Sequence, residues 1–234
     1  MKHWCIIIVA SLSFFRGFSQ ELRVMGEVNL GRYKMESLRE MVHPSPLQIS
    51  VPVKLVRDFP SFPGFRLAVF RGVTEEFSAG IQVGVNSTGR RFSYSDYTAS
   101  VNYDTKLHCV SIGLFTEFKI FEKNNWQLVA NLPVTTIYNV VHISTVVDSQ
   151  YLQVNNAFKV GSFNVGVQPG ISVGRKIGSI FLRGNCYYEY NSPGQLQYYN
   201  SDVSFTNSNY EPVIVEWDGL RAGIAVVYTF QFGD

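Results

Sequence analysis

The chain has 234 residues, of which 16% are charged and 15% aromatic, and its formal net charge is +2 at pH 7. This length suits one large all-β domain, and the aromatic-rich, charge-poor composition is typical of a β-rich protein in an apolar solvent and argues against a disordered chain. The small net charge supplies no basic stripe that could track a phosphate backbone, so nucleic acid is not expected as a partner.

The first residues have the pattern of a signal peptide. Two basic residues precede an apolar run over residues 4–15, and small residues follow at Gly17 and Ser19. This run is too short for a transmembrane helix, which needs roughly 20 apolar residues. The sequence therefore predicts a signal peptide over residues 1–19, cleaved near its last residue, and one domain over residues 20–234.

Eight later segments alternate apolar and polar residues over about ten positions each, the length of a tilted strand that crosses a bilayer. Within residues 77–86, for example, apolar side chains at every second position from Phe77 to Val85 oppose small or polar ones from Ser78 to Asn86. The eight predicted strands cover residues 22–33, 65–73, 77–86, 106–121, 126–140, 162–173, 180–190 and 220–232.

Short and long connections alternate between these strands. Short turns are expected at residues 74–76, 122–125 and 174–178, and long loops at 34–64, 87–105, 141–161 and 191–219. An up-and-down barrel in a bacterial outer membrane has this asymmetry, with short periplasmic turns and long external loops. We therefore predict an all-β fold, an eight-stranded antiparallel transmembrane β-barrel, with both termini on the periplasmic side.

The first long loop carries two further signals. Residues 34–42 can form a brief amphipathic helix, and the proline-rich stretch 58–64 cannot pair as a central strand. These signals predict a structured loop.

Alternation alone leaves open which face points outward, because a soluble lipocalin-like barrel has its apolar face inside. The polar face here is rich in Gly, Ser, Asn and Gln and carries only a few charges of both signs, which can fill a narrow lumen with hydrogen bonds and ion pairs. Aromatic residues also gather at both ends of the apolar face, as they do at membrane interfaces. Both observations favour lipid outside. The charged residues of the polar face are Arg23, Glu27, Arg66, Glu117, Lys119, Arg183, Glu189 and Arg221.

The final strand resembles the C-terminal signal by which outer-membrane barrels are handed to their assembly machinery. The matching residues are Arg221, Gly223, Val226 and Tyr228, although the chain ends Gly233-Asp234 where many such strands end on an aromatic residue. The mature chain as a whole is similar to small outer-membrane barrels of the OmpA-barrel and OmpX type, in particular those of Bacteroidota. This resemblance implies location in a bacterial outer membrane and contact with its assembly machinery.

Candidate chemistry is sparse, and no catalytic, cofactor-binding or metal-binding residue is assigned. His142 and Ser144 share one face of a predicted strand and resemble the His-x-Ser pattern of outer-membrane lipid A deacylases, with Glu189 as a conceivable third member. Cys109 and Cys186 fall on strands that are not neighbours and are predicted to be separate thiols.

Charged lumen residues could serve as an ion or proton gate, but a structural filling role is favoured. The candidates are Glu117, Lys119 and Arg183. An eight-stranded barrel has an interior just wide enough for side chains, which disfavours a water-filled pore.

The predicted function is therefore that of a non-enzymatic outer-membrane barrel that displays external loops for envelope structure or surface interaction. Its expected partners are outer-membrane lipid and an extracellular protein or glycan, bound through a Tyr-, Asn- and Ser-rich loop over residues 198–210. The alternatives are a lipid A-modifying enzyme of the deacylase kind and a soluble lipocalin-like binder of an apolar ligand.

Overall fold

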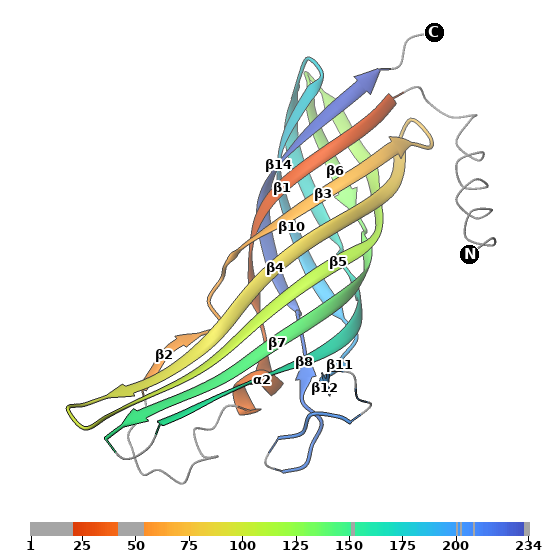
Figure 1. Ribbon diagram of the computed structural model, residues 1–234. Coiled ribbons are helices and arrows are strands. Elements are labelled where there is room, and N and C mark those ends of the chain that lie inside the picture. The colour runs from red at the N-terminus through yellow and green to blue at the C-terminus, as the bar shows by residue number, and fades with distance from the viewer. Residues whose placement is uncertain are drawn as a thin grey trace.

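The structure is a computed structural model that describes residues 21–41, 54–150, 153–199, 201, 203–207 and 209–231. The chain forms one tilted β-barrel whose two ends differ (Figure 1). One end, here called the turn end, carries the short connections and both ends of the described chain. The other, the loop end, carries the long connections. The predicted signal peptide, residues 1–19, lies outside the described residues.

Long antiparallel strands form the wall, and short elements gather at the loop end. The wall consists of β1 (Glu21–Tyr33), β3 (Pro63–Gly72), β4 (Phe77–Ser95), β5 (Ala99–Lys123), β6 (Trp126–Asn131), β7 (Val134–Ser149), β8 (Gln153–Val167), β9 (Gly170–Ile177), β10 (Ile180–Asn191) and β14 (Gly219–Gln231). The short elements are α2 (Glu36–Met41), β2 (Lys54–Asp58), β11 (Gly194–Gln195), β12 (Gln197–Tyr198) and β13 (Ile214–Val215).

Two of the predicted strands are each divided by a proline that cannot donate to the ladder. β6 and β7 stay in one register with β5 on both sides of Pro133, and β8 and β9 stay in one register with β10 on both sides of Pro169. The backbone N–H of Gln168 donates to the carbonyl of Pro133 at 2.9 Å and bridges the break. Each pair therefore acts as one wall strand, which gives the eight that were predicted.

The wall closes on itself. β14 pairs with β1 along the full length of β1, from Glu21 opposite Gln231 to Tyr33 opposite Gly219, and pairs with β10 on its other edge. A closed barrel leaves no unpaired strand edge in its wall, which is the condition for crossing hydrocarbon.

The apolar face points outward around the barrel. Ile81 is 63% exposed, Phe163 70% and Ile224 66%, whereas the alternating Gln82 and Asn164 are buried inside. Lipid outside is thus the correct orientation, and the lipocalin-like alternative, with an apolar lumen, is wrong.

The turn end agrees with the predicted turns. Asn124 and Asn125 connect β5 to β6 with φ of 51° and 66°, the left-handed conformation that a tight hairpin requires and that Asn tolerates. Gly178, with φ of 61°, lies in the turn between β9 and β10. Tight turns of this kind bring the strands directly back across the wall.

Two predicted loops are wrong in length, because most of residues 87–105 and 141–161 is strand. β4 and β5 stay paired out to Ser95 opposite Ser100, and β7 and β8 out to Asp148 opposite Gln153. These two hairpins form a sheet that leans away from the barrel axis at the loop end (Figure 1), here called the outer sheet.

The outer sheet was missed because the apolar face changes sides along the strands. On β7 three of the four outward residues up to Val140 are apolar, whereas beyond it the inward residues Val141, Ile143 and Val147 are the buried apolar ones. The inner face of the outer sheet is covered by other parts of the chain.

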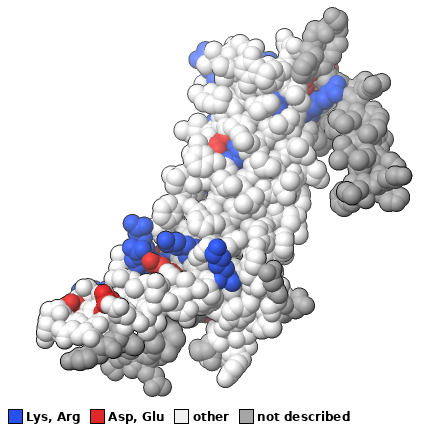
Figure 2. Space-filling view, viewed as in Figure 1, with Lys and Arg blue, Asp and Glu red and all other residues white. Residues whose placement is uncertain are grey.

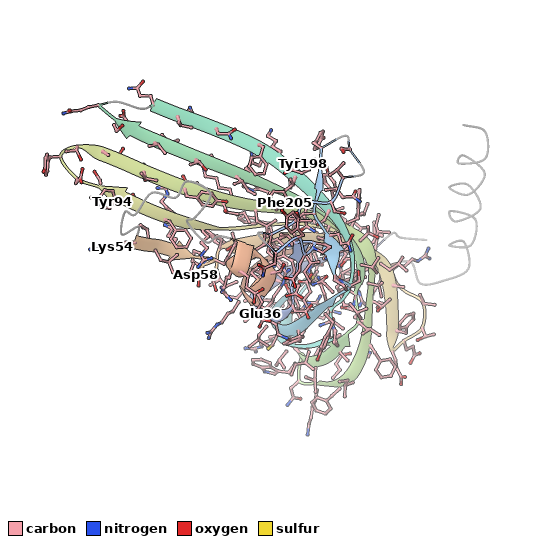
Figure 3. All side chains as sticks on the ribbon, turned by 90° about the horizontal axis from the view of Figure 1, so that it is seen from below. Glu36, Lys54, Asp58, Tyr94, Tyr198 and Phe205 are labelled. Carbon is pink, nitrogen blue, oxygen red and sulfur yellow. The ribbon has the colours of Figure 1, made fainter. Side chains whose placement is uncertain are left out.

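That cover is an apolar plug at the mouth of the barrel. Met35, just before α2, and Leu38 of α2 belong to it, and the connection between β10 and β14 contributes Trp217. Seen from the loop end, Glu36 of α2 and Phe205 lie over the mouth while Tyr94 lies out on the β4–β5 hairpin (Figure 3). The predicted helix over residues 34–42 is confirmed for Glu36–Met41, and Val42 lies outside the described residues.

Candidate functional site

The lumen is filled in layers, starting with an apolar layer at the turn end. Phe70 and Phe115 pack with ring centroids 4.8 Å apart, and Met25, Phe181 and Val227 belong to the same buried cluster. A cavity of about 30 Å³ lies beside this layer, room for about one water molecule.

Buried ion pairs lie directly beside these apolar side chains and line the same cavity. The Arg183 guanidinium lies 2.8 Å from the Glu117 carboxylate, and Arg23 approaches the same carboxylate to 3.4 Å from the turn end. Lys119, predicted beside them, instead pairs with Glu122 at 3.1 Å near the rim. A matched carboxylate and guanidinium fill the lumen, as the structural interpretation of these charges expected.

A second group of charges lies nearer the mouth. Glu27 accepts hydrogen bonds from Asn29, Asn185 and Tyr187, and the Arg66 guanidinium lies 3.8 Å from its carboxylate. Further out, Glu189 forms an ion pair with Arg221, whose guanidinium lies over the rings of Tyr33 and Trp217.

The plug is tied to the wall by a buried amide network. The Trp217 indole N–H donates to the Asn139 side chain at 2.6 Å, and the Asn139 amide donates to Asn164 at 2.6 Å. Asn164 in turn donates to the carbonyls of Ser192 and Val215. The described part of the lumen is therefore packed with side chains from end to end and has the construction of a rigid support.

The proposed His-Ser-Glu set is not assembled. His142 and Ser144 lie on the outward face of β7, and no hydrogen bond joins them within the described residues, whereas Glu189 is fully buried inside the lumen beside Arg221. The carboxylate opposite Ser144 belongs to Asp104, which is bound by Arg91 at 2.5 and 2.8 Å.

The two cysteines also lie on opposite faces of the wall. Cys109 is buried on the inner face of β5, and Cys186 is exposed on β10, and both are free thiols.

A groove of about 710 Å³ lies at the loop end, on the outer side of the wall. It forms where β8 separates from β10. These strands pair only at Tyr190 opposite Val167 and Asn191 opposite Gly166, and beyond them β8 pairs with the short β12 instead. The lining residues are Tyr138, Gly161, Ser162, Phe163, Gln195, Gln197, Tyr198, Tyr199 and Ser201.

Aromatic rings and amides share this groove, here called the aromatic groove. Tyr138 and Phe163, at the loop-end margin of the apolar belt, pack with ring centroids 4.8 Å apart on the wall side of the groove, and Tyr198 lies against Phe158 and Phe205 on the other side. The carboxamides of Gln195 and Gln197 stand beside them. Flat apolar surface with nearby donors and acceptors suits ring-shaped polar ligands such as sugars, which stack on aromatics and hydrogen bond at their edges.

The predicted recognition loop supplies only part of this groove. Tyr198 and Tyr199 come from it, whereas Tyr210 at its other end is 87% exposed and does not line the groove. Tyr138 and Phe163 were predicted as outer-rim or apolar-face residues of strands, and no sequence signal joined them to the loop, because that contact depends on the separation of β8 from β10.

The described residues contain no cluster of three His, Cys, Asp or Glu side chains that could hold a metal ion. Among the same residues, no helix is long and apolar enough to cross a membrane.

No protein-family model and no curated protein sequence matches the chain. Among solved structures, it is similar to a major outer membrane protein from Thermus thermophilus, with a TM-score of 0.50 and 12% identity over 89% of this chain and 99% of that one. It is also similar to Ail, the attachment invasion locus protein of Yersinia pestis, in complex with the heparin analogue sucrose octasulfate, with a TM-score of 0.41 and 15% identity over 90% and 98% of the two chains. The Thermus similarity shows that the chain has the fold of an outer-membrane β-barrel.

Proposed function

We propose that the protein is an integral barrel of a bacterial outer membrane. The support is the closed wall together with its outward apolar belt, because exposed side chains such as Leu67, Ile112 and Ile224 would be costly in water and favourable in hydrocarbon. The signal peptide over residues 1–19, the domain over residues 20–234 and the C-terminal strand signal fit export and delivery to the barrel assembly machinery.

The barrel acts by binding at its outer surface and catalyses no reaction. The observation that carries this proposal is the aromatic groove, held open by a wall and a plug that are rigidly packed behind it. Its rings and carboxamides fit the sugar units of an extracellular glycan, one of the two partner classes that the loop composition predicted.

The test compares two tyrosines of similar chemistry in different places. Tyr199 lines the groove, whereas Tyr97 at the tip of the β4–β5 hairpin is 96% exposed and distant from it along the strands. Loss of one stacking ring costs about 0.5–1.5 kcal/mol, so Y199S lowers the affinity of cells for an immobilised glycan panel by about two- to tenfold.

Heat-modifiable gel mobility serves as the folding control for both variants, because a closed barrel resists detergent until it is boiled. If Y97S and Y199S bind the panel equally, the groove is not the binding site. If the wild-type protein is recovered in the aqueous phase without a mobility shift, the membrane placement itself is wrong.

A further inference from the structure

The outward face of the outer sheet changes from apolar to basic just beyond the lipid-facing belt. On β5, exposed Val110 is followed outward by His108 and then Lys106, and on β8 exposed Phe163 is followed by Gly161 and then Lys159. A tilted strand climbs about 2.4 Å along the membrane normal per residue, so the lysines lie about 10 Å beyond the last apolar side chains. The headgroup layer extends about 5–8 Å outside the hydrocarbon core, so the lysine backbones lie just beyond it and their long side chains can reach back to it.

Three basic residues on this outward face are direct neighbours across the strands. Lys106 on β5 is opposite His142 on β7, and His142 is opposite Lys159 on β8. Lys106, His142 and Lys159 are here called the basic row. Neighbouring strands are about 4.8 Å apart, so the two ammonium groups extend from backbones about 10 Å apart with an imidazole between them.

The basic row has no acidic partner in the described part of the chain. The nearest carboxylate along β5 belongs to Asp104, whose two oxygens are both bound by Arg91, and neither lysine forms an ion pair with a described residue. Two ammonium groups this close, with no carboxylate between them, favour the binding of an anion.

The surroundings of His142 are also positively charged. Burial, and then the charges of Lys159, His108 and Lys106, lower the pKa of His142 below its usual value. The His108 ring lies edge-on to the His142 ring at 6.1 Å. A bound anion beside this imidazole would raise its pKa.

A shallow cleft extends the row toward β4. It has a volume of about 180 Å³ and is lined by five basic side chains and by one carboxylate, that of Asp104, which Arg91 binds. The basic residues are Arg57, Arg90, Arg91, Lys106 and His108. Gly89 stands opposite Lys106 and forms the floor, where a Cβ would lie 2.6 Å from the Thr105 carbonyl oxygen. Figure 2 shows Lys and Arg side chains, with some Asp and Glu among them, gathered toward the loop end, beside the largely uncharged surface of the barrel.

We infer that the basic row and its cleft bind the phosphate groups of outer-leaflet lipid headgroups and so anchor the outer sheet on the membrane surface. Both features lie on the lipid side of the wall and continue its apolar belt, and phosphate oxygens are the complementary charge at this depth. The inference rests on the proposed membrane placement but not on glycan binding.

The test is native mass spectrometry of the folded protein released from detergent that contains equal amounts of phosphatidic acid and phosphatidylcholine. We expect the wild-type protein to retain phosphatidic acid preferentially. Each lysine near a membrane surface is worth about a fivefold preference, so K106Q/K159Q lowers the preference by about 25-fold. The matched control K34Q/K54Q removes the same charge from the loop-end surface away from the row and keeps the wild-type preference.

Each other outcome has a definite meaning. A preference that K106Q/K159Q retains, or that the control loses equally, overturns the inference. A third outcome is that inorganic phosphate raises the pKa of His142, followed by its NMR ring signals, while the protein shows no preference for phosphatidic acid. The row would then bind a soluble anion, and the lipid assignment would be overturned. If the wild-type protein shows no heat-modifiable shift in gel mobility, the proposed membrane placement is wrong. This result distinguishes failure of the membrane placement from failure of the lipid-binding inference.

Discussion

Glu117 allows a test of how far water enters the lumen, because its two arginine partners differ in solvent exposure. The Arg183 side chain is 1% exposed and lies 2.8 Å from the carboxylate, whereas the Arg23 side chain is 31% exposed and lies 3.4 Å away. Arg183 also packs near Phe115 and Phe181, in the apolar layer of the turn end.

The expected costs differ because water screens only one of the pairs. Removing one partner of a buried pair leaves an uncompensated charge and costs about 3–5 kcal/mol, whereas an exposed pair is worth about 0–1 kcal/mol. Since Arg23 stays near Glu117 in the variant, R183Q lowers the free energy of unfolding by about 3 kcal/mol, and R23Q by less than about 1 kcal/mol.

Urea titration in lipid vesicles measures both variants, with the folded fraction followed by gel mobility without boiling. At a denaturant slope of about 2 kcal/mol/M, the R183Q midpoint falls by roughly 1.5 M and the R23Q midpoint by less than about 0.5 M. Equal shifts for R23Q and R183Q would refute the reasoning, because they would show that water screens both pairs and that the lumen is open.

Two further predictions concern single groups. The thiol of Cys186 is exposed on the outer face of the wall, and that of Cys109 is buried on the inner face. A lipid-soluble maleimide therefore modifies Cys186 in the folded protein and reaches Cys109 only after unfolding. Modification of both thiols at the same rate would contradict the packed mouth of the barrel. Hydrogen bonds to Asp96 from the Tyr94 hydroxyl and from Thr98 and Ala99 hold its pKa well below the usual range. A lowered pKa contributes stability that is present above the ordinary pKa and is lost only as the pH falls through the lower folded value. Amide protection at the tip of the β4–β5 hairpin therefore persists from pH 7 to about pH 4 after correction for intrinsic exchange, and D96N reduces it at pH 7; loss of protection near pH 4 in the wild-type protein would contradict this.

The local sequence was sufficient to predict a strand wherever each face of that strand has the same surroundings along its whole length. Between residues 77 and 86, one face meets hydrocarbon and the other the polar lumen over the whole length, so the alternation has one sense and identifies the strand. The short turns followed from the same boundaries, and Asn124-Asn125 supplied the conformation that such a turn requires. The charges of the polar face could likewise be assigned to the lumen, although their pairing could not.

The sequence pattern no longer predicted the strands where the surroundings of their two faces change. Past Val140 the outward face leaves the hydrocarbon and the inward face meets the plug, so most apolar positions move from the even to the odd residues of β7. Read as one pattern, this change of sense looks like the end of alternation, and residues 141–161 were predicted as a loop. The aromatic groove was missed for a related reason, because its wall and loop residues meet only through the pairing of β12 with β8.

The sequence by itself determined the repeating strand, the alternation of short and long connections and the orientation of the lipid-facing side, because each depends on interactions between neighbours along the chain and on a uniform solvent. Only the tertiary structure decided which charges pair across the lumen, how α2 and the last long connection close the mouth, and that Lys106, His142 and Lys159 stand in one row. These features join residues far apart in sequence, and their positions are fixed by strand register and closure of the barrel, which no local pattern encodes.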